Sequence, residues 1–306
     1  MGNIAFLFPG QASQFVGMGK DLYGSFPRAK EIFDNANEIL GFDLCSVCFE
    51  GPEEQLKQTR ITQLAIFVHS VIVAELLAEK GIYPRMAAGH SLGEYSALVA
   101  AGAIGFEDGL QVVKKRGELM QHAGEQQPGT MAAIIGLPDE QVIDICAEAS
   151  SAGIVAAANF NSPQQVAISG SLEGVARAGE LSKQYGAKKV IPLVVSGAFH
   201  SPLMESAQKE LKAALEAITI QSASFPVYAN VTAKPVSAAG EIRELLCKQL
   251  THPVRWVATI ENMIADGATD FFEVGPGNVL SGLVKRINRD YSVLAIGKAD
   301  EIFTRI

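Results

Sequence analysis

The sequence has little positive charge and no long apolar run. It contains 25 lysine and arginine residues against 33 aspartate and glutamate residues, which gives a formal net charge of −8. An acidic chain has no general affinity for nucleic acid phosphates or for anionic lipid, so we expect neither nucleic acid nor a membrane as a partner. The longest uninterrupted apolar stretch, residues 97–106, is far shorter than the ~20 residues that cross a bilayer.

The N-terminal residues also lack the features of a targeting segment. No basic leader is present, and the apolar run at residues 4–8 is shorter than the core of a signal peptide. We therefore expect a cytoplasmic protein.

Cysteine is scarce, with four residues in the chain. Cys45 and Cys48 form a Cys-x-x-Cys pair, which could bind zinc or perform redox chemistry. A structural zinc site needs two further ligands at short spacing, but Cys146 and Cys247 stand alone and no paired histidines occur. We expect reduced, buried thiols and no metal site.

Predicted strands and helices alternate along most of the chain. Residues 3–8 and 85–89 are expected to form buried strands, with helical segments between and after them. This alternation predicts an α/β fold with a doubly wound, mostly parallel sheet and an α/β-hydrolase-like core. Between residues 129 and 195 the order changes to β-α-β-β-α-β, which is typical of a ferredoxin-like domain.

The predicted domains follow from this change of order. Residues 1–128 and 196–306 form the two parts of a large α/β domain, and residues 129–195 form an inserted ferredoxin-like domain. A cleft between two such lobes is a usual position for a ligand site.

Gly89-His90-Ser91-Leu92-Gly93 matches the Gly-x-Ser-x-Gly motif, and it lies between a predicted strand and a predicted helix. This is the context of a nucleophile elbow, in which a sharp turn exposes the serine hydroxyl. The N-terminal end of the following helix would stabilise developing negative charge. The alternative is a glycine-lined packing turn without chemistry.

A serine nucleophile requires a base, and the chain contains five histidines. His200 is the best candidate because it lies where the inserted domain returns to the large domain and a helix begins. The other histidines occupy positions typical of structural residues: His69, His90, His122 and His252. No carboxylate stands out as a partner for His200, so a backbone carbonyl could orient its ring.

Arg116 lies on a predicted helix at three- and four-residue spacing from Val112, Val113, Leu119 and Met120. It therefore shares the apolar face of that helix and points inward. A buried guanidinium needs an anion, and its planar fork fits a carboxylate. That carboxylate belongs either to a substrate or to an interior glutamate or aspartate.

Several short motifs occur in order over nearly the whole chain. They are Phe8-Pro9-Gly10-Gln11, Thr62-Gln63, Gly89-His90-Ser91-Leu92-Gly93-Glu94-Tyr95, Arg116, Gly197-Ala198-Phe199-His200-Ser201 and Glu273-Val274-Gly275-Pro276-Gly277. Together they resemble the malonyl-CoA:acyl carrier protein transacylase family.

The resemblance implies a role for each reacting group. Ser91 would form the acyl ester, and His200 would act as general base and acid. Gln11 and the backbone N–H of Leu92 would form the oxyanion hole. Arg116 would hold the free carboxylate of the malonyl group.

Four further residues receive supporting roles from the resemblance. The backbone carbonyl of Gln249 would orient the histidine, while Asn161 and Gln63 would line the cleft. Phe199 occurs at a position where relatives that use malonyl commonly carry phenylalanine, which favours malonyl over methylmalonyl.

The resemblance also implies the partners and the reaction. The malonyl group would pass from malonyl-CoA to the phosphopantetheine thiol of holo acyl carrier protein, without metal or organic cofactor, on a monomeric enzyme that feeds fatty acid synthesis. An acyltransferase of a polyketide pathway, a serine acyl hydrolase or editing thioesterase, and an inactive carrier-protein docking module are the alternatives.

Overall fold

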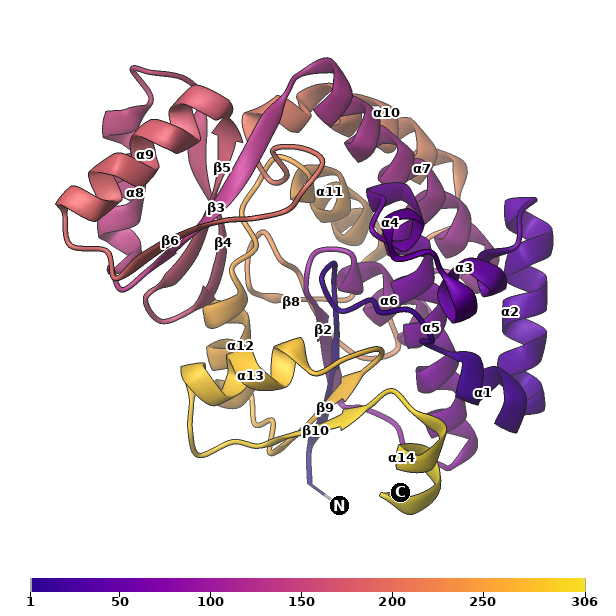
Figure 1. The fold of residues 1–306 in the computed structure, drawn as a ribbon. Coiled ribbons are helices and arrows are strands. Elements are labelled where there is room, and N and C mark those ends of the chain that lie inside the picture. The colour runs from indigo at the N-terminus through magenta and orange to yellow at the C-terminus, as the bar shows by residue number, and fades with distance from the viewer. Residues whose placement is uncertain (1, 306) are drawn as a thin grey trace.

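The computed structural model describes residues 2–305, which form two separate β-sheets with helices packed against them (Figure 1). The larger sheet has six strands in the order β10-β9-β1-β2-β7-β8. Only β8 is antiparallel to its neighbour, so the predicted α/β class with a mostly parallel sheet is confirmed. The strands are β1 (Ile4–Phe8), β2 (Met86–Gly89), β7 (Val227–Tyr228), β8 (Pro235–Val236), β9 (Asp270–Val274) and β10 (Val293–Ile296).

Helices cover both faces of this sheet because the side chains of its central strand alternate in direction. Phe6 and Phe8 of β1 are buried against one group of helices, whereas Ala5 and Leu7 are buried against another. The first group is α1 (Lys20–Ser25), α2 (Pro27–Leu40), α3 (Leu44–Glu50), α4 (Glu53–Leu56), α5 (Thr59–Glu79), α6 (Gly93–Ala100), α7 (Phe106–Gln126), α10 (Glu205–Ala217), α11 (Ala239–Gln249) and α14 (Ala299–Thr304). The second group is α12 (Trp256–Ala265) and α13 (Val279–Ile287).

Helix α5 is long and apolar enough to cross a membrane by length and composition alone. However, 89% of its most apolar window is buried inside the protein. A helix that is apolar on all sides is expected where other elements surround it, and α5 is such a core helix.

The second sheet has four antiparallel strands in the order β4-β5-β3-β6. Two helices pack on it, and their buried side chains form a hydrophobic cluster of their own with those of the sheet. The chain order is β-α-β-β-α-β, as the sequence predicted. These elements are β3 (Gly129–Ile135), α8 (Asp139–Ala149), β4 (Val155–Ser162), β5 (Gln165–Ser171), α9 (Leu172–Gln184) and β6 (Lys189–Pro192).

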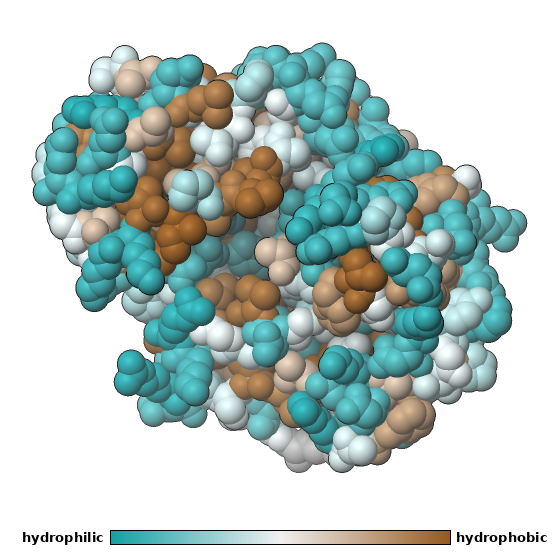
Figure 2. All heavy atoms as spheres, viewed as in Figure 1, coloured by the Kyte–Doolittle hydropathy of each residue, from teal (hydrophilic) through white to brown (hydrophobic). Residues whose placement is uncertain are grey.

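The small sheet is joined to the rest of the molecule along the edge of β4. The Phe160 N–H donates to the Val254 carbonyl over 2.9 Å, and the Val254 N–H donates to the Ala158 carbonyl over 2.9 Å. Figure 2 shows a hollow between the small sheet and the body of the molecule, with apolar side chains gathered at its rim. The carboxyl ends of β1 and β2 point toward this hollow (Figure 1).

Two segments differ from the expected elements. The sequence of residues 225–230 predicts a strand there, but only Val227–Tyr228 forms one, because the chain leaves the sheet before Asn230. The last strand of the small sheet ends at Pro192 rather than at residue 195, and the loop that follows leaves Val194 99% exposed.

Candidate active site

Ser91 lies in the sharp turn between β2 and α6, with a φ of 51°. A positive φ is unusual for a residue with a side chain and marks a strained, over-determined turn. A Cβ atom at Gly89 would lie 1.8 Å from the Gly93 carbonyl carbon, and one at Gly93 would lie 2.1 Å from the Phe8 carbonyl oxygen. Both positions therefore require glycine, and the turn has the geometry predicted for a nucleophile elbow.

Asn230 fastens this turn from a distant part of the chain. Its Oδ1 accepts the Ser91 backbone N–H over 2.7 Å, and its Nδ2 donates to the Gly89 carbonyl over 2.6 Å. The side chain is fully buried, so each of these bonds replaces one that water would otherwise supply. Sequence reasoning did not identify Asn230, because nothing local to residue 230 indicates a partner so far away.

The His200 ring lies between Ser91 and Gln249. Its Nε2 is 2.8 Å from Ser91 Oγ, and its Nδ1 is 2.9 Å from the Gln249 carbonyl oxygen. Because a carbonyl only accepts, Nδ1 carries the hydrogen and Nε2 is left with a lone pair toward the serine. A backbone carbonyl thus orients the histidine, as expected.

His200 is neutral at physiological pH. Burial, and after it the charge of Arg116, lower its pKa to about 3. A neutral imidazole is the form that can accept the serine proton.

Arg116 is 1% exposed and reaches Ser91 from α7. Its Nη1 donates to Gln63 Oε1 over 2.6 Å, and its Nη2 donates to Gln249 Oε1 over 2.8 Å and to Ser91 Oγ over 3.0 Å. The guanidinium also lies over the ring of Tyr95, 5.5 Å from its centroid. Within residues 2–305 it forms no ion pair with a carboxylate, which removes the alternative of a direct structural salt bridge.

The two groups predicted for the oxyanion hole flank the same turn. Gln11 follows β1, and its Nε2 donates a long hydrogen bond of 3.4 Å to Thr59 Oγ1. Leu92 is buried at the N-terminal end of α6, and no described residue accepts a hydrogen bond from its backbone N–H. The Leu92 N–H therefore has no acceptor among residues 2–305, and the Gln11 amide has one long hydrogen bond to Thr59, which leaves the assignment of both groups to an oxyanion hole a prediction.

Asn161 reaches the turn through His90. Its Oδ1 lies 2.8 Å from His90 Nε2, and the His90 ring packs on Trp256 with 5.4 Å between centroids. Because Asn161 belongs to β4, this contact ties the small sheet to the residue beside the nucleophile. Phe199, next to His200, is buried in the main hydrophobic core.

Glu94 is a second site-adjacent residue that sequence reasoning missed. It is 2% exposed, and its Oε2 accepts from Gln249 Nε2 over 2.7 Å and from the Asn230 backbone N–H over 3.1 Å. Burial raises the pKa of its carboxyl group to about 7. Its position three residues after Ser91, on the first turn of α6, was the available signal.

Within residues 2–305, no cysteine forms a hydrogen bond with a residue of this site. Cys45, Cys48 and Cys146 are buried, and burial raises the pKa of the Cys45 thiol to about 11. All four are free thiols in the structure, and no group of three potential metal-ligating side chains occurs in the described part of the chain.

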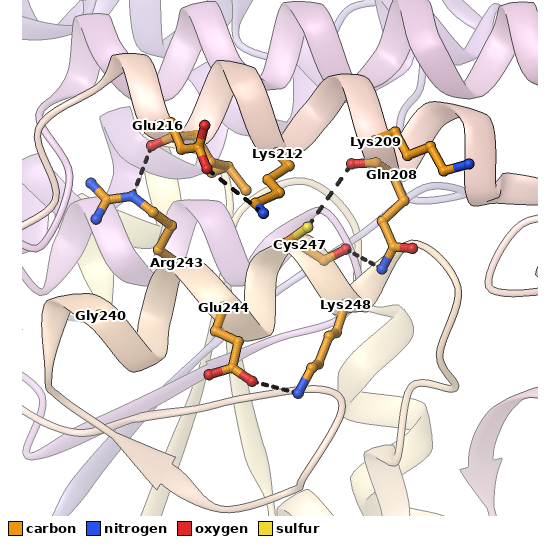
Figure 3. Close-up of a pocket in the computed structure, with 10 residues that line it drawn as sticks. Gln208, Lys209, Lys212, Glu216, Gly240, Arg243, Glu244, Cys247 and Lys248 are labelled. Atoms are coloured by element: carbon orange, nitrogen blue, oxygen red, sulfur yellow. Dashed lines mark hydrogen bonds and ion pairs between the residues drawn. The ribbon is translucent and has the colours of Figure 1, made fainter.

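A cavity of about 480 Å³ lies between α10 and α11, away from Ser91 (Figure 3). Its walls are formed by Cys247 and by several lysine and glutamate side chains. Two of these, Glu244 and Lys248, form an ion pair of 2.5 Å. None of the residues predicted for the active site lines it.

Comparison with known proteins identifies the family of this chain. The acyl transferase domain family matches residues 5–298. Malonyl CoA-acyl carrier protein transacylases from Bacillus subtilis (strain 168) and Escherichia coli (strain K12) are 48% and 45% identical. The alignment with the first covers 99% of this chain and 96% of the relative, and the alignment with the second covers 94% and 93%.

Solved structures show the same fold over the whole length. The malonyl CoA-acyl carrier protein transacylase of Coxiella burnetii has a TM-score of 0.96 and 41% identity, covering 100% of this chain and 97% of that one. A malonyl-transacylase in complex with a type II polyketide synthase acyl-carrier protein has a TM-score of 0.95 and 43% identity, covering 99% and 98%. This chain therefore belongs to the acyl transferase family, and within it to the malonyl CoA-acyl carrier protein transacylases that its motifs resemble.

Proposed function

We propose that this protein transfers the malonyl group of malonyl-CoA to the phosphopantetheine thiol of acyl carrier protein through a malonyl ester of Ser91. The observation that carries the proposal is the position of Arg116, a buried cation that pairs directly with no carboxylate of residues 2–305 and lies 3.0 Å from the nucleophilic oxygen. Such a cation selects an acyl group that brings its own carboxylate.

In the first half-reaction Ser91 Oγ attacks the thioester carbonyl while its proton passes to His200 Nε2. The negative charge on the carbonyl oxygen is received by Gln11 Nε2 and the Leu92 N–H. The C–S bond then breaks, the coenzyme A sulfur takes the proton from His200, and the malonyl ester of Ser91 remains.

The second half-reaction runs through the same groups in reverse. The phosphopantetheine thiol gives its proton to His200 Nε2 and attacks the ester carbonyl. The Ser91 C–O bond breaks, and the serine oxygen recovers the proton. Coenzyme A and the carrier protein share the pantetheine arm, so one cleft serves both. The reaction as written requires neither metal nor organic cofactor.

The malonyl carboxylate contributes to its own transfer. In the resting site the Arg116 charge is the second cause, after burial, of the low His200 pKa. A carboxylate on Arg116 cancels that charge and raises the basicity of His200 when the serine must be deprotonated. Malonyl-CoA therefore creates a better base than an acyl thioester without a carboxylate.

The proposal also covers the fold class, the domain limits, the location and oligomeric state of the enzyme, and the pathway that it supplies. The large sheet is an α/β-hydrolase-like core interrupted by a ferredoxin-like insertion, with domain limits at residues 128/129 and 195/196. The enzyme acts as a cytoplasmic monomer and supplies fatty acid synthesis, since most of the relatives described above are transacylases named without a polyketide partner. A polyketide role is the second candidate, because one similar structure contains a polyketide carrier protein.

The test is formation of the acyl-enzyme. Incubation with malonyl-CoA alone should add one malonyl mass to the intact protein, and peptide mapping should place it on Ser91. Ser91→Ala should show no addition, whereas unchanged labelling of that variant would reject the assignment.

A further inference from the structure

The side-chain amide of Gln249 connects Arg116 with Glu94. Its Oε1 accepts from Arg116 Nη2 over 2.8 Å, and its Nε2 donates to Glu94 Oε2 over 2.7 Å and to the Ser91 carbonyl over 3.0 Å. All three side chains that form this chain of bonds are at most 2% exposed.

An amide group can be placed in two orientations that differ by exchange of its oxygen and nitrogen. Only one orientation presents an acceptor to Arg116, which has donors alone. The Glu94 carboxylate has only acceptors when ionised, so it requires the nitrogen of Gln249 on its own side. Glu94, together with the Ser91 carbonyl, therefore favours the orientation in which the amide oxygen faces Arg116.

The same residue supports the turn that carries the nucleophile. Glu94 Oε2 also accepts the backbone N–H of Asn230, whose side chain holds the Ser91 N–H and the Gly89 carbonyl. One carboxylate oxygen therefore contacts both the residue that orients Arg116 and the residue that fastens the nucleophile elbow.

Building on the proposed function, we propose that Glu94 is a positioning residue for malonyl selectivity, acting through the Gln249 amide to aim the Arg116 guanidinium at the acyl carboxylate. Arg116 has neutral acceptors in the resting site, and Glu94 is the buried carboxylate placed one amide away from it. The guanidinium forms no ion pair within residues 2–305, so it can exchange its neutral acceptors for the substrate carboxylate.

Two substitutions separate the acceptor role of Glu94 from its charge. Glu94→Gln retains an oxygen that can accept from both Gln249 Nε2 and the Asn230 N–H, but it carries no charge. Glu94→Met retains the approximate length of the side chain and loses both properties. If positioning depends on the acceptor, the two variants behave differently.

The experiment measures kcat/KM for malonyl-CoA and for acetyl-CoA, with coenzyme A release as the readout, together with the melting temperature of each protein. In Glu94→Met the ratio of malonyl to acetyl kcat/KM should fall about ten-fold or more, the effect of losing one hydrogen bond to a charged group. In Glu94→Gln the ratio should stay within about three-fold of wild type or rise, since the negative charge that opposes the malonyl carboxylate is gone.

Glu273→Gln and Glu273→Met are the matched controls. Glu273 is also a fully buried glutamate that accepts backbone N–H groups, from Leu280 and Ser281, but it has no contact with the Arg116 network. These variants should lower the melting temperature without changing the malonyl-to-acetyl ratio.

An unchanged ratio in Glu94→Met, or an equal fall in both Glu94 variants, would overturn the proposal. If Glu94→Met does not fold, Gln249→Leu breaks the same bridge from its other end, and an unchanged ratio there overturns it equally. Failure of the wild-type protein to accept malonyl-CoA would instead reject the proposed function, independently of Glu94.

Discussion

At the scale of single residues, the Ser91 hydroxyl oxygen contacts both a base and a cation. His200 Nε2, 2.8 Å away, takes its proton, while Arg116 Nη2, 3.0 Å away, donates a hydrogen bond to it. The arginine stabilises negative charge on the oxygen but also holds it in place. Under the proposed function, we expect a malonyl carboxylate to compete for the same guanidinium and so to weaken its hydrogen bond to the serine oxygen.

Replacing Arg116 should therefore change which acyl group is accepted. In Arg116→Ala the malonyl carboxylate would lie unpaired in the cleft, at a cost of about 2–5 kcal/mol. Malonyl transfer should fall by tens- to thousands-fold, whereas acetyl transfer should persist or rise, because acetyl needs no ion pair and the His200 pKa is no longer lowered by a neighbouring cation. Steady-state kcat/KM for both thioesters measures the change. A parallel fall of both activities would make Arg116 a purely structural residue.

The low pKa of His200 gives a pH prediction. Because this pKa lies below the ordinary value of 6.5, the neutral base persists on the acid side of neutrality. Glu94 titrates near pH 7 but keeps an acceptor oxygen when protonated. The rate of Ser91 malonylation should stay flat from about pH 8 down to about pH 5, measured by rapid-quench mass spectrometry. A ten-fold loss per pH unit beginning at 6.5 would show that His200 has an ordinary pKa in the working enzyme.

Sequence reasoning at this scale proposed the reacting groups and several supporting residues, among them Gln249, but it gave no role to Asn230 or Glu94. Ser91, His200 and Arg116 were identified because each has a local signal: a motif, a junction or an apolar helix face. Asn230 and Glu94 bond to residues brought close only by the fold, with 139 positions separating Ser91 from Asn230. The contact between Asn161 and His90, 71 positions apart, was equally invisible before the small sheet was placed.

At the scale of elements, the nucleophile depends on how β2, α6 and the end of β7 meet. In the β2–α6 turn, Gly89 packs so closely on Gly93, and Gly93 on the Phe8 carbonyl, that neither position has room for a side chain. Asn230, just beyond β7, holds the turn through two hydrogen bonds. The strained φ of Ser91 persists only because these contacts over-determine it.

Asn230→Ala should consequently affect stability and catalysis together. It leaves the Ser91 N–H and the Gly89 carbonyl buried without partners, which should lower the free energy of unfolding by about 2–4 kcal/mol and slow malonylation at least ten-fold. Denaturant unfolding measures the free energy of unfolding, and the rate of the initial burst of acyl-enzyme formation measures the speed of malonylation. Asn262→Ala is the control, since it removes one partly buried bond to the Ala233 carbonyl outside the elbow and should leave the burst rate unchanged. A normal burst in Asn230→Ala would show that the turn holds Ser91 without it.

Helix α11 shows how an element can be missed although its signal is present. Ile242, Leu245, Leu246 and Gln249 are buried at spacings of three, four and seven residues, the pattern of one helical face. Applied to residues 239–249, that pattern predicts both the helix and the inward position of Gln249. By contrast, β8 pairs over only two residues, too few for alternation to be detected, whereas β7 lies within the strand predicted at residues 225–230.

At the scale of the whole molecule, the site exists only where the two sheets are joined. The large sheet supplies the elbow, α7 supplies Arg116, and His200 follows the segment that returns from the small sheet. Hydrogen bonds between β4 and the Val254 segment set the separation of the two parts. The order of elements around the small sheet could be predicted from the sequence. The hydrogen bonds that join this sheet to the Val254 segment could not, because they link residues far apart in the chain and leave no periodic pattern in the sequence.

A chase of the isolated acyl-enzyme tests directly whether the malonyl group passes from Ser91 to acyl carrier protein. Enzyme loaded with isotopically labelled malonyl-CoA is freed of coenzyme A and mixed with holo acyl carrier protein or with buffer alone, and the label is followed by mass spectrometry. The label should leave Ser91 rapidly only when carrier protein is present, and it should appear as a thioester on the phosphopantetheine thiol. Release of free malonate at the same rate with and without carrier protein would contradict this prediction, and would identify the protein as a hydrolase.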